Sequence, residues 1–136
     1  MKRLLVISCL CFFGMAAHAV PAVVDYVYDG DTFTGQVILS PDILVDVRVR
    51  LRNIDTPEIK GQCEAEKKMA KQARQVLHDL IPRGTIVDLQ KIKDDKYLGR
   101  IDANVILSDG RDVATILIKQ GLGRLYKGGK RQTWCK

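Results

Sequence analysis

The sequence predicts a mainly β domain with helices, of the α+β class, in which five strands close into a barrel. Three observations lead to this prediction. Short segments rich in β-branched and aromatic residues recur along the chain, with turns between them. The segment 64–80 instead repeats its apolar residues at spacings of three and four, as an amphipathic helix does. The length of 136 residues leaves room for a single compact domain.

The N-terminal segment, residues 1–19, is predicted to be a cleaved secretion signal. Two basic residues precede an apolar run, and Ala17 and Ala19 stand where a signal peptidase reads small side chains. The apolar run is too short to span a bilayer as a helix, and a lipoprotein signal ending at Cys9 would leave it shorter still. We therefore expect an exported protein, periplasmic or secreted, with one domain over residues 20–136 and no stable membrane association.

The first half of this domain predicts three strands. Residues 22–28 are rich in Val and Tyr and end at an Asp-Gly-Asp turn, and residues 32–39 continue as a strand that stops at Ser-Pro-Asp. Residues 45–52 alternate apolar and polar side chains without exception. One face of this third strand would therefore carry the valines and Leu51 to the core, and the other face would carry arginines.

The second half predicts a long helix, two strands and a short helix. The helix over 64–80 is stopped by a Pro-Arg-Gly sequence, and strands are expected over 85–92 and 100–107. A helix over about 112–120 follows, with Gly121 as its left-handed cap. The apolar stripe of the long helix would consist of Ala65, Met69, Ala73, Val76, Leu77 and Leu80.

This order of elements favours a five-stranded OB-fold barrel, with one long helix after the third strand and a shorter helix after the fifth. Flat sandwiches usually need more strands at this length. Barrels of this kind often bind nucleic acids, but a fold does not establish a function by itself.

Composition narrows the possible partners and cofactors. The 22 basic residues outnumber the 16 acidic ones, which favours an anionic partner such as nucleic acid or a membrane surface. Signal cleavage would leave only Cys63 and Cys135, and we expect an exported protein to join two such cysteines. Zinc is disfavoured, because these cysteines lie far apart and His78 is the one histidine left.

Two acidic clusters follow the first and third predicted strands. The first, Asp-Gly-Asp-Thr at residues 29–32, is by itself more simply explained as a hairpin turn. The second places Asp55 and Glu58 on either side of a Thr-Pro step, which holds the chain extended. An exposed strand face does not explain this pair. Two carboxylates with different neighbours can divide labour, one binding a hard cation and the other taking a proton from water.

Two arginines could complete a phosphate site. Arg50 belongs to the alternating strand, and Arg100 ends an Asp-Asp-Lys-Tyr-Leu-Gly-Arg sequence that would otherwise be an ordinary charged hairpin. Two guanidinium groups can embrace one phosphate through paired hydrogen bonds, as phosphoryl transfer requires.

Taken in order, these clusters resemble the staphylococcal nuclease-like (thermonuclease) family. The matching motifs are D-G-D-T, V-R-L-R-N-I-D-T-P-E, D-K-Y-L-G-R and L-I-K-Q-G-L-G-R, and the likeness covers about residues 23–126. The resemblance implies an OB-fold phosphodiesterase that uses calcium, acts on DNA and RNA, and leaves 3′-phosphate ends. An all-oxygen ligand set would also accept magnesium.

The resemblance also implies roles for individual residues. The groups that would bind the metal are the carboxylates of Asp31 and Asp55 and the backbone carbonyl of Thr56. Glu58 would activate water as the general base. Arg50 and Arg100 would bind the phosphate and stabilise the transition state. The side chains that would contact nucleotides are Lys96, Tyr97 and Tyr126, although core packing explains Tyr126 equally well. Leu98 departs from the family pattern, because it adds a residue before Gly99.

The main alternative is an OB-fold module that binds single-stranded nucleic acid without cutting it. Carboxylates beside a phosphate would repel it, so a pure binder has no use for them. In both cases the partner is DNA or RNA, and we expect a monomer. A basic tail is expected to strengthen this binding without reading sequence. It consists of Lys119, Arg124, Lys127, Lys130, Arg131 and Lys136.

Overall fold

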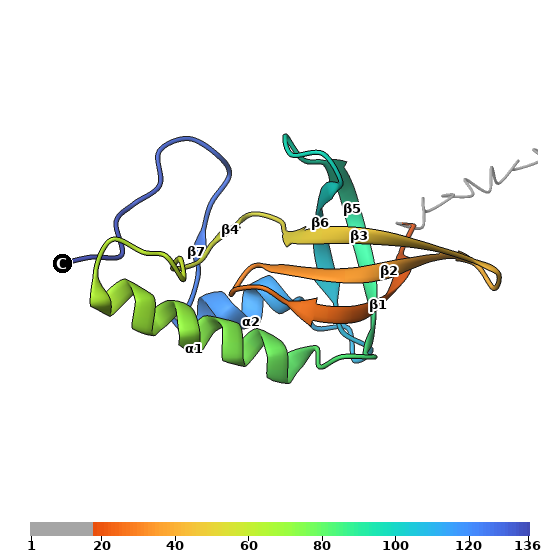
Figure 1. Cartoon of the computed structure of the whole chain (residues 1–136), viewed down its shortest axis with the longest axis horizontal. Helices are drawn as coiled ribbons and strands as arrows, with labels where there is room; N and C mark the ends of the chain where they lie inside the picture. The colour runs from red at the N-terminus through yellow and green to blue at the C-terminus, as the bar shows by residue number, and fades with distance from the viewer. Residues whose placement is uncertain (1–17) are drawn as a thin grey trace, which may run out of the picture.

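The computed structural model describes residues 18–136, which form a closed five-stranded barrel with two helices (Figure 1). All but the last two residues of the predicted signal 1–19 lie outside the described residues. The elements in chain order are β1 (Val20–Val27), β2 (Thr32–Ser40), β3 (Ile43–Leu51), β4 (Ile54–Asp55), α1 (Glu64–Leu80), β5 (Ile86–Asp94), β6 (Arg100–Ile106), α2 (Val113–Lys119) and β7 (Arg124–Leu125).

The strand order around the barrel is β1-β2-β3-β6-β5, and the pairing of β1 with β5 closes it. Neighbouring strands are antiparallel except β3 and β6, which are parallel. A parallel pair needs a crossover connection, and the chain segment that contains α1 and β5 supplies it. The predicted five-stranded barrel is therefore confirmed, with its long helix after the third strand and its short helix after the fifth.

The barrel interior is filled by the inward side chains of the strands, among them Phe33, Val49 and Leu89, which are fully buried. Leu77 of α1 and Leu117 of α2 join this core from outside the barrel. No helix among residues 18–136 is both long and apolar enough to cross a membrane.

The outer end of β3 corrects one expectation. Val45 was expected on the core face but is 41% exposed, whereas Val49 and Leu51 are buried. The reason is that β6 pairs with β3 only from Arg48 to Leu51. Beyond that point β3 has only β2 beside it, and the tip of the β2–β3 hairpin extends away from the barrel (Figure 1).

The first turns of α1 correct a second expectation. The buried residues are Glu66, Ala70, Ala73 and Leu77, so the buried face begins one residue later than the predicted stripe and includes an acid. Ala65 is exposed and Met69 half-buried. The acid is turned inward because its carboxylate accepts hydrogen bonds from the preceding loop.

Two short strands, β4 and β7, pair in a separate sheet that the sequence did not predict. Each has two residues, which is too short for a recognisable alternation. Their pairing places Asp55 opposite Arg124 and so brings the beginning of the tail beside the second acidic cluster. The short helix agrees with prediction, since Asp112 caps it and Gly121 has a φ of 72°.

Candidate active site

A cleft of about 660 Å³ lies between the turn after β1, the segment after β4 and the turn between β5 and β6. The predicted site residues that line it are Asp31, Arg50, Thr56, Glu58, Lys96, Tyr97, Arg100 and Tyr126. Asp55 is 2% exposed and does not line the cleft. Residues that are far apart in the sequence, from four of its segments, therefore meet at one place.

Gly30 brings the first acidic cluster against the second. A Cβ atom at this position would lie 2.7 Å from Cβ of Ala73 in α1 and 3.1 Å from Oγ1 of Thr56. Only a residue without a side chain permits this close approach. The Asp-Gly-Asp turn is therefore more than a hairpin connection, because its glycine seats Asp31 beside the Thr56 segment.

Asp31 is a buried carboxylate held by its neighbours in the turn. Its Oδ1 accepts a hydrogen bond from the Thr32 hydroxyl at 2.9 Å, and its backbone N–H donates to Oδ1 of Asp29 at 3.1 Å. Burial, and secondly the nearby charge of Asp29, raise the pKa of Asp31 to about 6, against the opposing effect of Arg50. A cation at this carboxylate would relieve both unfavourable effects.

Arg50 is fixed by the strand register and by a backbone carbonyl. Thr32 lies opposite Arg50 in the β2–β3 ladder. Nη2 of Arg50 donates to the carbonyl of Ile54 at 3.0 Å and lies 3.7 Å from Oδ2 of Asp31. This guanidinium therefore bridges the two acidic clusters, and it also lines the cleft.

Glu66 holds the loop that carries Glu58. Its Oε1 accepts the backbone N–H of Glu58 at 3.2 Å, and its Oε2 accepts that of Gln62 at 2.9 Å. Glu66 is buried, whereas the Glu58 side chain is 55% exposed. Glu66 was not predicted from the sequence, because one acid in the first turn of a helix is common and has the ordinary explanation of the helix dipole.

The turn between β5 and β6 accommodates the additional Leu98 by turning it outward. Leu98 is fully exposed, and Gly99 has a φ of 75°, a conformation that favours glycine. Arg100 still lines the cleft, where it forms an ion pair with Asp95 and lies 4.4 Å from the centre of the Tyr97 ring. Lys96 lies over the same ring at 5.0 Å.

Asp102 is a second residue of the cleft that was not predicted from the sequence. It lines the cleft, and its Oδ1 is buried without a hydrogen-bond partner among the described residues. Burial, followed by the charge of Asp95, raises its pKa. Nothing in the alternating pattern of this strand distinguishes Asp102 from an ordinary exposed residue.

The tail, which is predicted to strengthen nucleic-acid binding, also makes contacts within the site. Arg131 enters the cleft and forms ion pairs with Asp55 and Glu58, and its Nη2 lies 3.3 Å from the carbonyl oxygen of Thr56. Trp134 follows it, and its indole N–H donates to Oδ2 of Asp55 at 3.1 Å. All three partners of Arg131 belong to the predicted site, but this contact was not predicted from the sequence.

Two other tail residues have structural contacts. Arg124 lies over the Trp134 ring at 3.7 Å and donates to the carbonyl of Thr133 at 2.9 Å. The hydroxyl of Tyr126 donates to the carbonyl of Gly129 at 2.7 Å, so this side chain organises the tail as well as lining the cleft.

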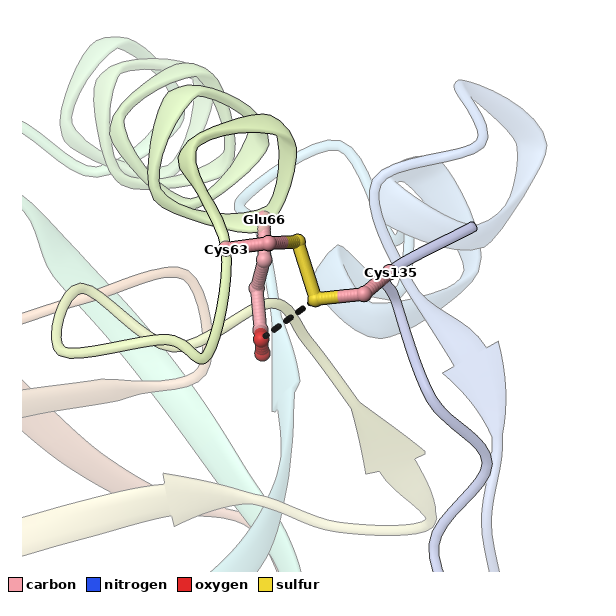
Figure 2. Close-up of side chains that lie close together, drawn as sticks. All are labelled: Cys63, Glu66 and Cys135. Carbon is pink, nitrogen blue, oxygen red and sulfur yellow. Dashed lines mark hydrogen bonds between the residues drawn. A yellow bond between two sulfur atoms is a disulfide. The ribbon is translucent and has the colours of Figure 1, made fainter.

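Cys63 and Cys135 form a disulfide, as expected, with their Cα atoms 6.0 Å apart (Figure 2). Oε2 of Glu66 lies 3.8 Å from Sγ of Cys135, so these three residues have the spacing of a metal site. They do not make one, because the two sulfur atoms are bonded to each other and Glu66 already accepts two backbone N–H groups.

The oxygen atoms that could hold a cation instead belong to residues that line the cleft and to Asp55, which is buried beside Thr56. One guanidinium, that of Arg131, reaches Asp55, Thr56 and Glu58 together, so their oxygens converge on a single positive group. Asp31 directly follows Gly30, which lies against the Thr56 side chain. Two carboxylates and a carbonyl are hard ligands that suit calcium or magnesium.

The chain also matches a known protein family. A family model described as staphylococcal nuclease homologue matches residues 48–134, a range that begins in β3 and ends in the tail. The match includes Arg50, Asp55, Glu58 and Arg100 and continues past Arg131. A comparison with curated proteins found no match.

Proposed function

Because this chain belongs to the staphylococcal nuclease homologue family, we propose that it is a phosphodiesterase that hydrolyses DNA, RNA or both and leaves 3′-phosphate ends. The observation that carries this proposal is the meeting of Arg50, Arg100 and Glu58 at one cleft, with buried carboxylates beside them. A cleft built only to bind nucleic acid would not need acids at the place where the phosphate enters.

We propose calcium as the cation, held by Asp31, Asp55 and the Thr56 carbonyl. These oxygen ligands would leave most of the coordination positions of calcium to water and substrate, so the affinity should be weak until substrate binds. When bound, the cation would neutralise negative charge on the phosphoryl oxygens.

The side chains of the protein would supply a general base and two groups that bind the phosphate. Glu58 would take a proton from the attacking water, since its side chain is exposed to the cleft while its backbone is held by Glu66. Arg50 and Arg100 would bind the non-bridging oxygens and stabilise the charge that develops on them.

Lys96 and Tyr97 would contact the nucleotides beside the scissile phosphate. The Tyr97 side chain is 55% exposed at the edge of the cleft, so a base could stack on it. Tyr126 would take part through the tail loop that it holds.

We also propose that the protein is exported by means of residues 1–19. The Cys63–Cys135 disulfide supports this, because disulfides persist mainly in oxidising compartments such as the periplasm and the exterior.

Product analysis tests the proposed reaction. Oligonucleotides of DNA and RNA, labelled at the 5′ end, should be shortened by the purified protein in calcium. The new ends should carry 3′-phosphates, which a phosphatase removes with a change in gel mobility. Oligonucleotides that are bound but stay intact would support the alternative, a non-catalytic single-strand binding module.

We predict that Arg50→Lys lowers kcat/KM by roughly tenfold or more, because one ammonium cannot make the two-pronged phosphate contact. Arg48→Lys is the matched control, since Arg48 lies in the same strand but packs over Tyr28 and does not line the cleft. Steady-state kinetics on both variants checks this, and equal rates would remove Arg50 from the mechanism.

We predict that Lys127 and Lys130 strengthen nucleic-acid binding through charge alone. Both are exposed, and they flank the two glycines of the tail loop between Tyr126 and Arg131, which line the cleft. The slope of log K against log salt is negative. On single strands its magnitude should decrease by roughly 0.7 for each phosphate that the protein no longer neutralises. The double variant Lys127→Gln/Lys130→Gln should therefore show a shallower slope, measured by fluorescence anisotropy. An unchanged slope would mean that these lysines are only solvated.

A further inference from the structure

We infer that Arg131 sets the affinity of the site for its cation, by competing with that cation for the oxygens of Asp55 and Thr56. The identity of the cation site rests on the proposed function. The competition itself rests on contacts that the tail makes in the structure.

The guanidinium of Arg131 occupies the same oxygens that the cation would use. Its Nε donates to Oδ1 of Asp55 at 2.5 Å, and its Nη2 lies 3.3 Å from the Thr56 carbonyl oxygen. The second carboxylate oxygen of Asp55, Oδ2, accepts the Trp134 indole N–H at 3.1 Å. A cation that binds Oδ1 of Asp55 and the Thr56 carbonyl must therefore displace Arg131, and it must also displace Trp134 if it takes Oδ2 as well.

Because Arg131 and the cation are both positively charged, they cannot bind Asp55 at the same time. A guanidinium is permanently positive, so a divalent ion at the same carboxylate would meet electrostatic repulsion as well as occupied lone pairs. Asp55 is buried, and water screens this repulsion less than it would at the surface. The Arg131 side chain is 40% exposed, so it has a path out of the site toward solvent or a substrate phosphate.

The tail is held at both ends, which keeps Arg131 near the site. On one side β7 pairs with β4, which places Arg124 opposite Asp55. On the other side Cys135 is bonded to Cys63, directly before α1. A tethered group acts at a high effective concentration. Opening the disulfide should therefore weaken the competition, though less than removing the guanidinium does.

Terbium luminescence measures this competition without relying on catalysis. Tb³⁺ replaces Ca²⁺ at oxygen sites, and Trp134 is the one tryptophan of the chain, so energy transfer from its indole reports on an ion at Asp55. Calcium would then be titrated against bound terbium to obtain its Kd. Asp55→Asn should abolish the signal and so identify the site.

We expect Arg131→Ala to lower the Kd for calcium by roughly ten- to a hundredfold, the value of a charged hydrogen bond. Arg131→Gln, which removes the charge but keeps more of the side chain than alanine does, should act in the same direction if the alanine variant is unstable. Lys130→Ala is the matched control, because it removes the same charge from the preceding residue and should change the Kd much less. The double variant Cys63→Ser/Cys135→Ser should fall between wild type and Arg131→Ala.

An Arg131 variant with the same Kd as Lys130→Ala, or with a higher one, would overturn the inference. Cleavage assays on the same preparations separate it from the proposed function. Tighter calcium binding without cleavage in any variant would uphold the competition and refute the nuclease. Cleavage by the protein together with a calcium Kd that Arg131→Ala leaves unchanged would support the nuclease and refute the competition.

Discussion

Replacing Glu58 with Gln should lower turnover by about 10²–10⁴-fold, while binding of nucleic acid survives. Water is a poor nucleophile toward a phosphodiester anion, so the site must remove a proton as the new bond forms. The amide has the shape of the carboxylate but cannot accept that proton. The backbone of residue 58 should stay in place, because the bond from its N–H to Glu66 does not involve the side chain that is changed.

A structural role for Glu58 gives the opposite result. Its carboxylate pairs with Arg131, so it could serve only to hold the tail. In that case Glu58→Gln would lose thermal stability, and the folded fraction would keep nearly normal specific activity. Both quantities should be measured on one preparation. Glu64→Gln is a matched control, since Glu64 is an exposed acid paired with Lys67 and does not line the cleft.

Removing the disulfide should destabilise the protein by about 4 kcal/mol in the chain-entropy model. The bond joins residues separated by 72 positions and so closes most of the domain into one loop, which restricts the unfolded chain. Denaturant unfolding of Cys63→Ser/Cys135→Ser against the oxidised wild type measures this difference.

The reduced wild type provides the control for that comparison. Its unfolding midpoint should approach that of the double serine variant, since both lack only the cross-link. Alkylation without reductant of unfolded protein that comprises residues 20–136, which lacks Cys9 and Cys11, should add no label to the oxidised chain. Two added labels, or equal midpoints before and after reduction, would contradict the assigned bond.

The barrel and its helices could be predicted because their signals are local. The alternation before Leu51 and the helical spacing over 64–80 each depend on a few neighbouring residues. A local pattern was not sufficient at Val45. This residue has the alternation of a core position, but β6 does not extend along its end of β3, so Val45 is exposed.

The contributions of the tail could not be predicted in the same way. Arg131 lies 76 residues after Asp55, and no periodicity connects them. One indirect signal was available, because pairing Cys63 with Cys135 brings the chain end close to the segment after Glu58. Glu66 was missed for a related reason, since its partners are backbone N–H groups, which leave no trace in the sequence.

Whether this cleft hydrolyses phosphodiester bonds with a bound cation is tested most directly by following cleavage of single-stranded DNA against free calcium. We expect cleavage to rise with calcium, to stop when a chelator is added in excess, and to return when calcium is restored. Cleavage that persists in the chelator would contradict the metal dependence, and DNA that stays intact at every calcium concentration would contradict the nuclease.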